Sequence, residues 1–319
     1  MKKTLVALAV IASAGAAMAQ SSVTIYGRVD AALVKAPGVG LHINAGNGTS
    51  RLGFRGVEDL GGGLRATFDL QHRFQVETGN LDGSAGTRPF WQGNSFVGLG
   101  GGFGDVHIGR RLTAYRNVDN IGDPWGTERV GSIGANTIVS DTRGTNGIGG
   151  AGLARTDQIY YESPNMSGFK AAVSLGLKTG DVNPVSVGAN NLFSTALWYG
   201  NGPLLVAFGY ERNRNKDTGI TLGANYDFGA AKLFAGYVSN DPAGPVASTK
   251  NIQLGVTVPV GAATIKAGFI RIDPPGAGTT NKLGLGMDYA LSKRTKLFTN
   301  LGKPKGVSAS FDMGVQHNF

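Results

Sequence analysis

Four arginines in strand-like stretches are the residues of this chain best suited to binding a charged solute. They are Arg28, Arg51, Arg55 and Arg73. Each stands in a stretch where polar and apolar residues alternate, so their side chains can share the polar side of extended strands. A guanidinium group stays ionised at any relevant pH. Such residues therefore offer fixed positive charge that attracts anions.

Motifs for catalysis, metal binding or nucleotide binding are weak. The glycine-rich stretch 98–104 lacks the following helix and the Lys-Ser/Thr of a phosphate loop, so we interpret it as a turn. The four histidines, His42, His72, His107 and His317, lack the spacing of a metal site. No Ser/His/Asp arrangement can be defended. We therefore expect no enzyme, no metal and no cofactor.

Alternation of apolar and polar residues continues through most of the chain. In the last stretch Phe311, Met313, Val315 and Phe319 share one side, and polar residues take most of the other. Stretches of this kind predict about sixteen strands of roughly ten residues, the length that a tilted strand needs to cross a bilayer. Short Gly/Asp/Pro turns alternate with longer polar stretches, which are 35–49, 77–89, 112–155, 179–190, 240–249 and 274–281. Such alternation is typical of a barrel with two different ends.

The N-terminus has the form of a secretory signal peptide. Lys2 and Lys3 precede an apolar run, 5–11, and small residues that end in Ala-Met-Ala at position 19. We expect cleavage there, which makes 1–19 a signal peptide and 20–319 a single domain; an uncleaved anchor is the alternative. The net charge of +9 falls to +7 without Lys2 and Lys3. No Lys/Arg cluster of the kind that binds nucleic acid is present.

Two architectures fit this alternation. A soluble β-sandwich would bury its apolar faces against each other, whereas a barrel in lipid would turn them outward around water. Aromatic residues near strand ends favour the barrel, because they form girdles at membrane interfaces. They are Tyr26, Tyr161, Tyr199, Tyr210, Tyr226, Tyr237, Tyr289 and Phe228. We predict an all-β, 16-stranded antiparallel transmembrane β-barrel, closed by pairing of the strand ending at Phe319 with the one beginning near Ser22.

The order of short motifs resembles the Gram-negative general porins, in particular the trimeric porins of beta-proteobacterial and neisserial type. The matching stretches are 22–30 (SVTIYGRVD), 50–64 (SRLGFRGVEDLGGGL), 96–99 (FVGL) with 104–110 (GDVHIGR), 159–164 (IYYESP), 291–295 (LSKRT) and 314–319 (GVQHNF). The resemblance implies a homotrimer in the outer membrane, surrounded by lipid and lipopolysaccharide, that passes ions and small hydrophilic solutes. It also implies that Phe319 is a signal for the outer-membrane assembly machinery.

The resemblance further implies that the third long loop, 112–155, folds into the lumen and narrows it. We expect a basic side of this constriction made by Arg28, Arg51, Arg55, Arg73 and Arg155. The acidic side would come from the loop, through Asp119, Asp123 and Glu128. An excess of arginine raises the local concentration of anions. Because family members often carry a basic residue where Tyr160 stands, we expect the anion preference to be mild.

The alternative within the same architecture is a substrate-selective outer-membrane channel for sugars, phosphate or carboxylates. It would need an aromatic track or a dense ring of lysines in the lumen. The inward candidates Phe90, Phe96, Tyr160 and Trp198 are scattered and form no clear track. An outer-membrane enzyme would need a Ser/His pair near an interface, which the sequence does not offer. An adhesin would need large exposed loops, which are lacking.

Overall fold

The computed structural model describes residues 21–44, 49–82, 89–118, 120–134, 155–177, 192–213, 216–243, 248–273 and 278–319. The expected signal peptide, 1–19, lies outside these residues. The elements are β1 (Ser22–Ala36), β2 (Val39–Asn44), β3 (Ser50–Gly61), β4 (Leu64–Phe74), β5 (Ser95–Gly101), β6 (Gly104–Leu112), the 3₁₀ helix η1 (Tyr115–Asn117), β7 (Arg155–Glu162), β8 (Phe169–Gly176), β9 (Phe193–Asn201), β10 (Leu204–Arg212), β11 (Thr218–Asp227), β12 (Lys232–Asp241), β13 (Thr249–Val260), β14 (Ala263–Asp273), β15 (Thr280–Ala290), β16 (Thr295–Pro304) and β17 (Ser310–Asn318). Across these ranges, no helix has the length and apolar character needed to span a bilayer.

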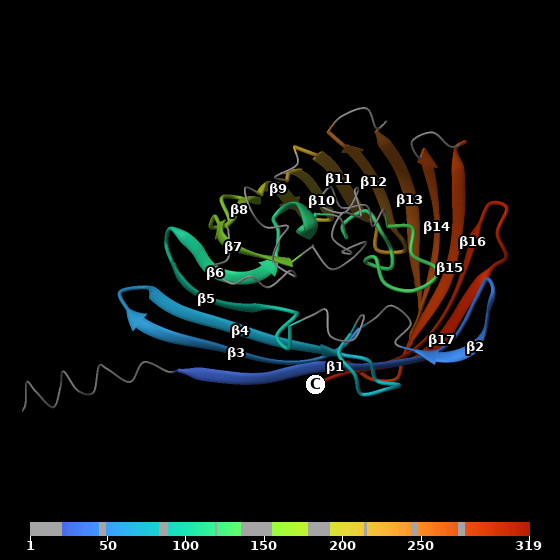
Figure 1. The fold of residues 1–319 in the computed structure, drawn as a ribbon, viewed down its shortest axis with the longest axis horizontal. Coiled ribbons are helices and arrows are strands. Elements are labelled where there is room, and N and C mark those ends of the chain that lie inside the picture. Colours follow the sequence, from blue (N-terminus) through green and yellow to red (C-terminus); the bar gives the residue numbers. More distant parts are fainter. Residues whose placement is uncertain are drawn as a thin grey trace, which may run out of the picture.

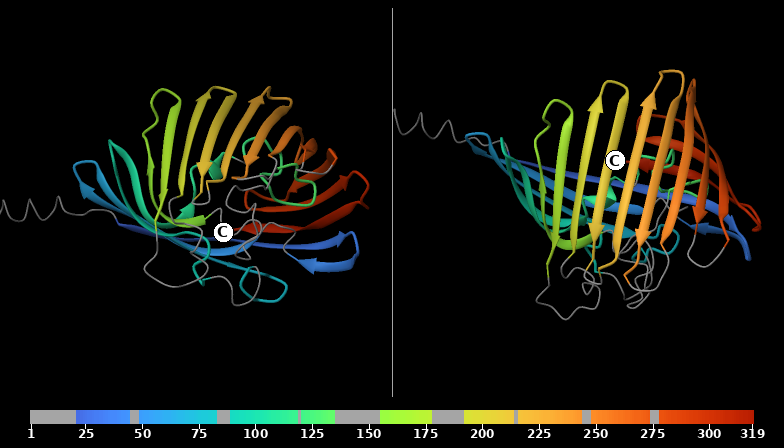
Figure 2. Two further views of the ribbon diagram at one scale, coloured as in Figure 1. Left: turned by 45° about the horizontal axis from the view of Figure 1, so that its top comes forward. Right: turned by 90° about the horizontal axis from the view of Figure 1, so that it is seen from above.

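The strands form one antiparallel sheet that closes on itself (Figure 1). β1 pairs with β17 from Arg28, opposite Asn318, to Lys35, opposite Phe311. Backbone hydrogen bonds in both directions between Gly27 and Phe319, at 3.0 and 3.1 Å, extend this seam. The expected pairing of the last strand with the first is thus confirmed, and the sheet is a β-barrel (Figure 2).

β2 and β3 act as one strand of the barrel wall, in two pieces. Both pair with β1: Ser22–Arg28 lies opposite β3, and Ala32–Ala36 lies opposite β2. Counted in this way the barrel has sixteen strands, as predicted. The prediction of a long loop at 35–49 is wrong for most of these residues, because β1 continues to Ala36 and β2 covers Val39–Asn44. The hairpin turns at Gly38, whose φ of 73° favours a residue without a Cβ.

The apolar side of each strand points outward. Val23 and Ile25 of β1 are 67% and 60% exposed, whereas Asp30, on the other side of the same strand, is fully buried. In water this exposure would be costly, since each buried CH₂ is worth about 0.8 kcal/mol. In a bilayer the same surface contacts hydrocarbon. The described strands therefore have the inverted arrangement of a membrane barrel.

Aromatic residues mark the ends of strands next to the short turns. Tyr161, Tyr226, Phe228 and Tyr289 are all partly exposed at this end of the barrel, as an interfacial girdle requires. Tyr26 does not belong to this girdle, so that expectation is wrong. Its hydroxyl group donates a hydrogen bond of 2.6 Å to Asp69 on the polar face of the sheet.

Packing inside the barrel is concentrated where residues 113–134 lie against the inner face. This segment, green in both figures, follows β6 and lies within the curve of the sheet (Figures 1 and 2). Ala114 and Val118 pack with Tyr160 and with alanines of β8, β9 and β10. Further along, Trp125 and Ile133 pack with apolar side chains of β12 and β14. The described part of the third long loop is thus fixed to the wall.

Candidate functional site

Three of the predicted basic residues form a row across adjacent strands. Arg28 of β1 is the direct cross-strand partner of Arg51 of β3, which is in turn the partner of Arg73 of β4. All three lie on the polar side of their strands. Like charges directly opposite each other weaken a sheet. The row therefore concentrates positive charge at a cost to stability.

The other two predicted arginines differ in their surroundings. Arg155, at the start of β7, interacts electrostatically with Arg73 and Arg51, and also with Arg110 and Arg116. It therefore lies close enough to the row to add to its positive charge, although its direct cross-strand partner is Leu112 of β6. Arg55 lies opposite Asp69 in β4, and its guanidinium carbon is 5.2 Å from the centroid of the Tyr26 ring. It faces an acid and an aromatic ring rather than the arginines. Arg110 and Arg116 were not among the predicted site residues.

Glu128 is the predicted loop acid that reaches the arginine row. Both of its carboxylate oxygens accept hydrogen bonds from Nη1 of Arg28, each at 2.8 Å. The side chain of Glu128 is 31% exposed and that of Arg28 is 14% exposed, so water reaches this ion pair. Asp119, a second predicted acid, lies outside the described residues.

Asp123, the third predicted acid, is used within the segment itself. Its oxygens accept hydrogen bonds from the backbone N–H groups of Trp125, Thr127 and Gly134, at 3.0, 2.8 and 3.0 Å. The hydroxyl group of Ser132 donates another at 2.5 Å. Only 2% of Asp123 is exposed. Its contacts are those of a residue that shapes a turn.

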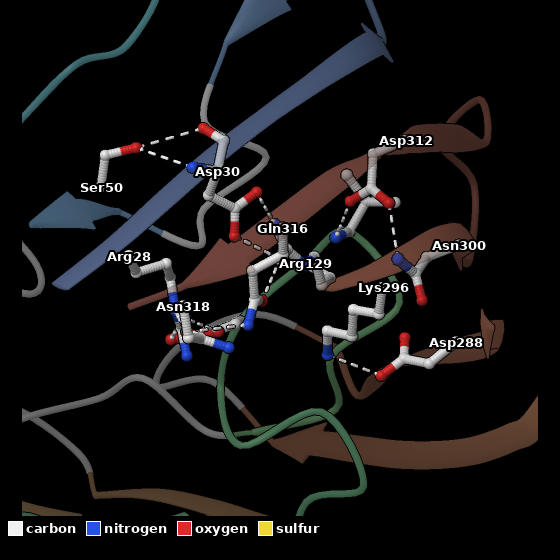
Figure 3. Close-up of polar contacts among 12 residues, drawn as sticks. Arg28, Asp30, Ser50, Arg129, Asp288, Lys296, Asn300, Asp312, Gln316 and Asn318 are labelled. Carbon is white, nitrogen blue, oxygen red and sulfur yellow. Dashed lines mark hydrogen bonds and ion pairs between the residues drawn. The ribbon is translucent and has the colours of Figure 1, made fainter. Parts of the chain in front are cut away.

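A second ion pair joins the segment to the wall beside the first. Nη1 of Arg129 donates to Asp30 at 2.9 Å, and Nη2 contacts both Asp30 and Gln316 (Figure 3). The same guanidinium group lies 3.7 Å from the centroid of the Phe298 ring. Sequence reasoning missed this pair. The signal was present as opposite charges at Arg28 and Asp30 in the strand, and at residues 128 and 129 in the loop.

Asp312 and Asn300 hold the next part of the segment. Asp312 accepts a hydrogen bond from the backbone N–H of Val130 at 2.9 Å and one from Nδ2 of Asn300 at 2.6 Å. Oδ1 of Asn300 accepts from Nε1 of Trp125 at 2.7 Å. Figure 3 shows the contact between Asp312 and Asn300 on the wall. These residues were also missed, because their partners are distant in the sequence.

Lysines supply positive charge on another part of the inner wall. Lys266 of β14 and Lys296 of β16 both contact Oδ2 of Asp288, at 3.0 and 2.7 Å; Figure 3 shows the contact of Lys296. Two ammonium groups share one carboxylate, so this cluster carries net positive charge. The basic character of the lining therefore extends beyond the arginine row.

The inward aromatic candidates do not form an open track. Phe90 stacks on His72 at 4.1 Å between ring centroids, and the adjoining Trp91 packs edge-on against Phe54, whose partner in β1 is the outward Ile25. Phe90 is therefore on the outer side, contrary to expectation. Tyr160 points inward but has no exposed surface.

Phe96 and Trp198 are only partly buried, and each packs against other residues of the inner wall. Phe96 stacks on His107 at 4.4 Å between ring centroids, and Trp198 packs against the cluster around Tyr160. Across the described part of the chain, no three His, Cys, Asp or Glu side chains lie together as a metal site would require. These observations leave the charged side chains of the inner wall as the feature that can act on a solute.

A closed barrel that is apolar outside and lined with ionised side chains defines a class of protein, the transmembrane β-barrel channel. Comparison of the sequence with models of known families narrows this class. Residues 4–306 match the model of the Gram-negative porin family, so the chain belongs to that family. It is an integral protein of the outer membrane and an outer-membrane porin.

Individual relatives agree with this assignment. Outer membrane porin protein 32 of Delftia acidovorans is 35% identical over 73% of this chain and 68% of its own length. The major outer membrane protein P.IB of Neisseria meningitidis serogroup B is 29% identical over the full length of both chains. Among solved structures, the anion-selective porin from Comamonas acidovorans has 28% sequence identity and a TM-score of 0.77, covering 94% of this chain and 100% of its own.

Proposed function

We propose that this porin is a general diffusion channel, through which ions and small hydrophilic solutes cross the outer membrane passively, with a mild preference for anions. The observation that carries the proposal is the row of Arg28, Arg51 and Arg73 across adjacent strands. Passive diffusion requires no reaction, and we assign none to the protein. Its substrates would be selected by size and charge.

The third long loop, 112–155, would narrow this channel by lying in the lumen. The contacts of residues 113–134 with inward-facing side chains of the wall support this arrangement. We assign Glu128 to the acidic side of the constriction, together with Asp119. We assign Asp123 to the internal shape of the loop, because its oxygens bind donors of the loop itself. In this respect the proposal differs from the expectation based on sequence.

The sign of the selectivity follows from the balance of charge along the lining. Glu128 offsets Arg28, whereas Arg51, Arg73 and Arg155 lie together as like charges. The Debye length is about 8–10 Å at physiological salt, so these charges act across much of a porin-sized lumen. Anions would accumulate there and cations would be depleted. The anion selectivity of the relative from Comamonas acidovorans supports the same sign.

The proposal includes the surroundings of the channel. The outward apolar side chains would contact membrane lipid and lipopolysaccharide, and Phe319 would be the residue recognised by the assembly machinery. We propose a homotrimer, with the second long loop, about 77–89, leaning on the neighbouring subunit. The trimer form of the outer membrane protein OmpT from Vibrio cholerae shares the fold, with 14% sequence identity and a TM-score of 0.72.

The measurement that tests this function is the reversal potential of purified protein in planar bilayers under a KCl gradient. We expect a potential displaced modestly toward the chloride equilibrium value. A clear preference for potassium would refute the proposed selectivity, and absence of channels would refute the function itself.

Liposome swelling with sugars of graded size would test the breadth of solutes that pass. A smooth decline with size is expected of a general porin. A saturable outlier among the solutes would instead favour the substrate-selective alternative.

A further inference from the structure

Four glycines form a row on the inner wall beneath the segment 113–134. Gly255, Gly268, Gly284 and Gly302 belong to β13, β14, β15 and β16, and each is the direct cross-strand partner of the next. A glycine inside a strand weakens that strand and often marks the close approach of another backbone. Four such residues in register therefore require a physical reason.

The segment itself gives the reason at two of these positions. A Cβ atom at Gly284 would lie closer than 3.0 Å to the carbonyl oxygen of Gly131, and one at Gly302 would do the same with the carbonyl oxygen of Val130. Real Cβ atoms essentially never come so close to another atom. Both clashes are with backbone, so no rotation of a side chain can relieve them.

At the other two positions the segment touches the wall through side chains. A Cβ atom at Gly268 would lie 2.8 Å from Cδ1 of Ile133 and 3.0 Å from Cζ3 of Trp125. One at Gly255 would collide with the ring of Pro124. The turn thus rests directly on the backbone of four strands, beside the labels β14 to β16 in Figure 1, through Pro124, Trp125, Val130, Gly131 and Ile133.

The segment is held in place along the wall by separate polar contacts. Trp125 binds Asn300, and the backbone of Val130 binds Asp312. Nζ of Lys282 donates a hydrogen bond of 2.6 Å to the carbonyl oxygen of Ser132. These contacts fix the position of the turn across the sheet.

We infer that the glycine row sets how far residues 124–133 stand from the wall, and thereby the free cross-section of the channel. The inference rests on the proposed function, because the height of the turn matters for transport only if solutes pass beside it. A methyl group at Gly284 is bonded to the strand and cannot move away from the carbonyl oxygen of Gly131. The turn must therefore move toward the barrel axis and narrow the lumen.

The primary test compares Gly284→Ala with Gly200→Ala in the full-length protein. Gly200 lies in β9, and the nearest atom to a Cβ there is Cδ1 of Leu205 at an ordinary 3.8 Å. Both variants add one methyl group to a strand. We expect the single-channel conductance of Gly284→Ala to fall by on the order of two-fold, since conduction depends on pore dimensions, and Gly200→Ala to match the wild type. Equal conductance in all three proteins would overturn the inference.

A milder pair guards against failure of Gly284→Ala to fold. Gly268→Ala meets only side chains, and Ile133→Val removes the Cδ1 atom that the new methyl group would strike. We expect Gly268→Ala to lower conductance and the double variant to recover part of it, because the contact with Trp125 remains, while Ile133→Val alone stays near the wild type. A loss that is undiminished in the double variant, or no loss in Gly268→Ala, would contradict the role of this contact.

Fluorescence of Trp125 reports the position of the turn without conduction. The chain has three tryptophans, so Trp91→Phe and Trp198→Phe leave Trp125 as the sole reporter. Trp125 is 5% exposed, and its emission should shift to the red in Gly284→Ala but not in Gly200→Ala. If emission shifts while no protein conducts, the proposed function fails and the glycine row retains its role. If the wild type conducts but neither emission nor conductance responds, the glycine row fails instead.

Discussion

Arg28 of β1 and Arg51 of β3 lie directly opposite each other on the inner wall. Two like charges in this relationship repel, and Glu128 offsets one of them through two hydrogen bonds of 2.8 Å. The net charge seen by a passing ion depends on this balance. Removing the carboxylate of Glu128 and removing an arginine of the row shift this balance in opposite directions.

Glu128→Gln removes the negative charge and nearly preserves the shape of the side chain. Arg28 then adds its full charge to the row, so anion preference should increase. The reversal potential in a KCl gradient should move closer to the chloride equilibrium value. Glu77→Gln is the control for loss of a carboxylate, because Glu77 is exposed at the start of the second long loop. A move toward the potassium value would show that Glu128 does not oppose the row.

Arg51→Gln and Arg73→Gln each remove one charge from the row. Both should reduce anion preference, while Arg51→Lys should retain most of it because the charge stays. The differences should shrink near 1 M salt, where the Debye length is about 3 Å. Lys293→Gln changes the same charge in an exposed turn. If it shifts the potential as much as Arg51→Gln, the position of the charge is unimportant and the prediction is wrong.

Arg129→Gln should destabilise the folded barrel strongly. It leaves Asp30 fully buried without its cation, and breaking a buried pair by removing one partner costs about 3–5 kcal/mol. Urea unfolding in detergent micelles, followed by the heat-dependent shift of folded protein in electrophoresis, measures the loss. The double variant Asp30→Asn, Arg129→Gln removes both charges and should recover part of the stability. Wild-type stability in Arg129→Gln would contradict a structural role for the pair.

Phe319→Ala should separate recognition during assembly from stability of the barrel. The hydrogen bonds that join residue 319 to Gly27 use backbone atoms only, so refolding in detergent should proceed. The amount of protein that reaches the outer membrane in cells should fall several-fold if the ring is an assembly signal. Phe311→Ala changes another aromatic residue of β17 and is the matched control. Equal losses in the two variants would point to packing in the last strand as the cause.

The walls of the barrel could be predicted from sequence because they depend on local alternation. Each residue at an even or odd position faces lipid or water regardless of distant partners, and so the inward placement of Arg28, Arg51 and Arg73 followed directly. Tyr26 was misplaced because an aromatic residue near a strand end fits either an interface or, as here, a hydrogen bond to Asp69. Residue type alone does not distinguish these cases.

The contacts of the segment could not be predicted, because they depend on closure of the barrel. Arg129 meets Asp30 and Gln316, which are 99 and 187 residues away in the sequence. The glycine row was equally hidden. Nothing in the local sequence distinguishes Gly284 from a glycine that has no neighbouring backbone above it. The register of β13 to β16 is needed to align them.

The two ion pairs also determine how the segment is aligned with the wall. Glu128 and Arg129 are consecutive and carry opposite signs, and they bind Arg28 and Asp30, which carry the reverse order. A slip by one residue in one direction would set Arg129 against Arg28, and a slip in the other would set Glu128 against Asp30. Both errors bring like charges together. The order of the charges in the two pairs therefore disfavours a shift of the segment in either direction.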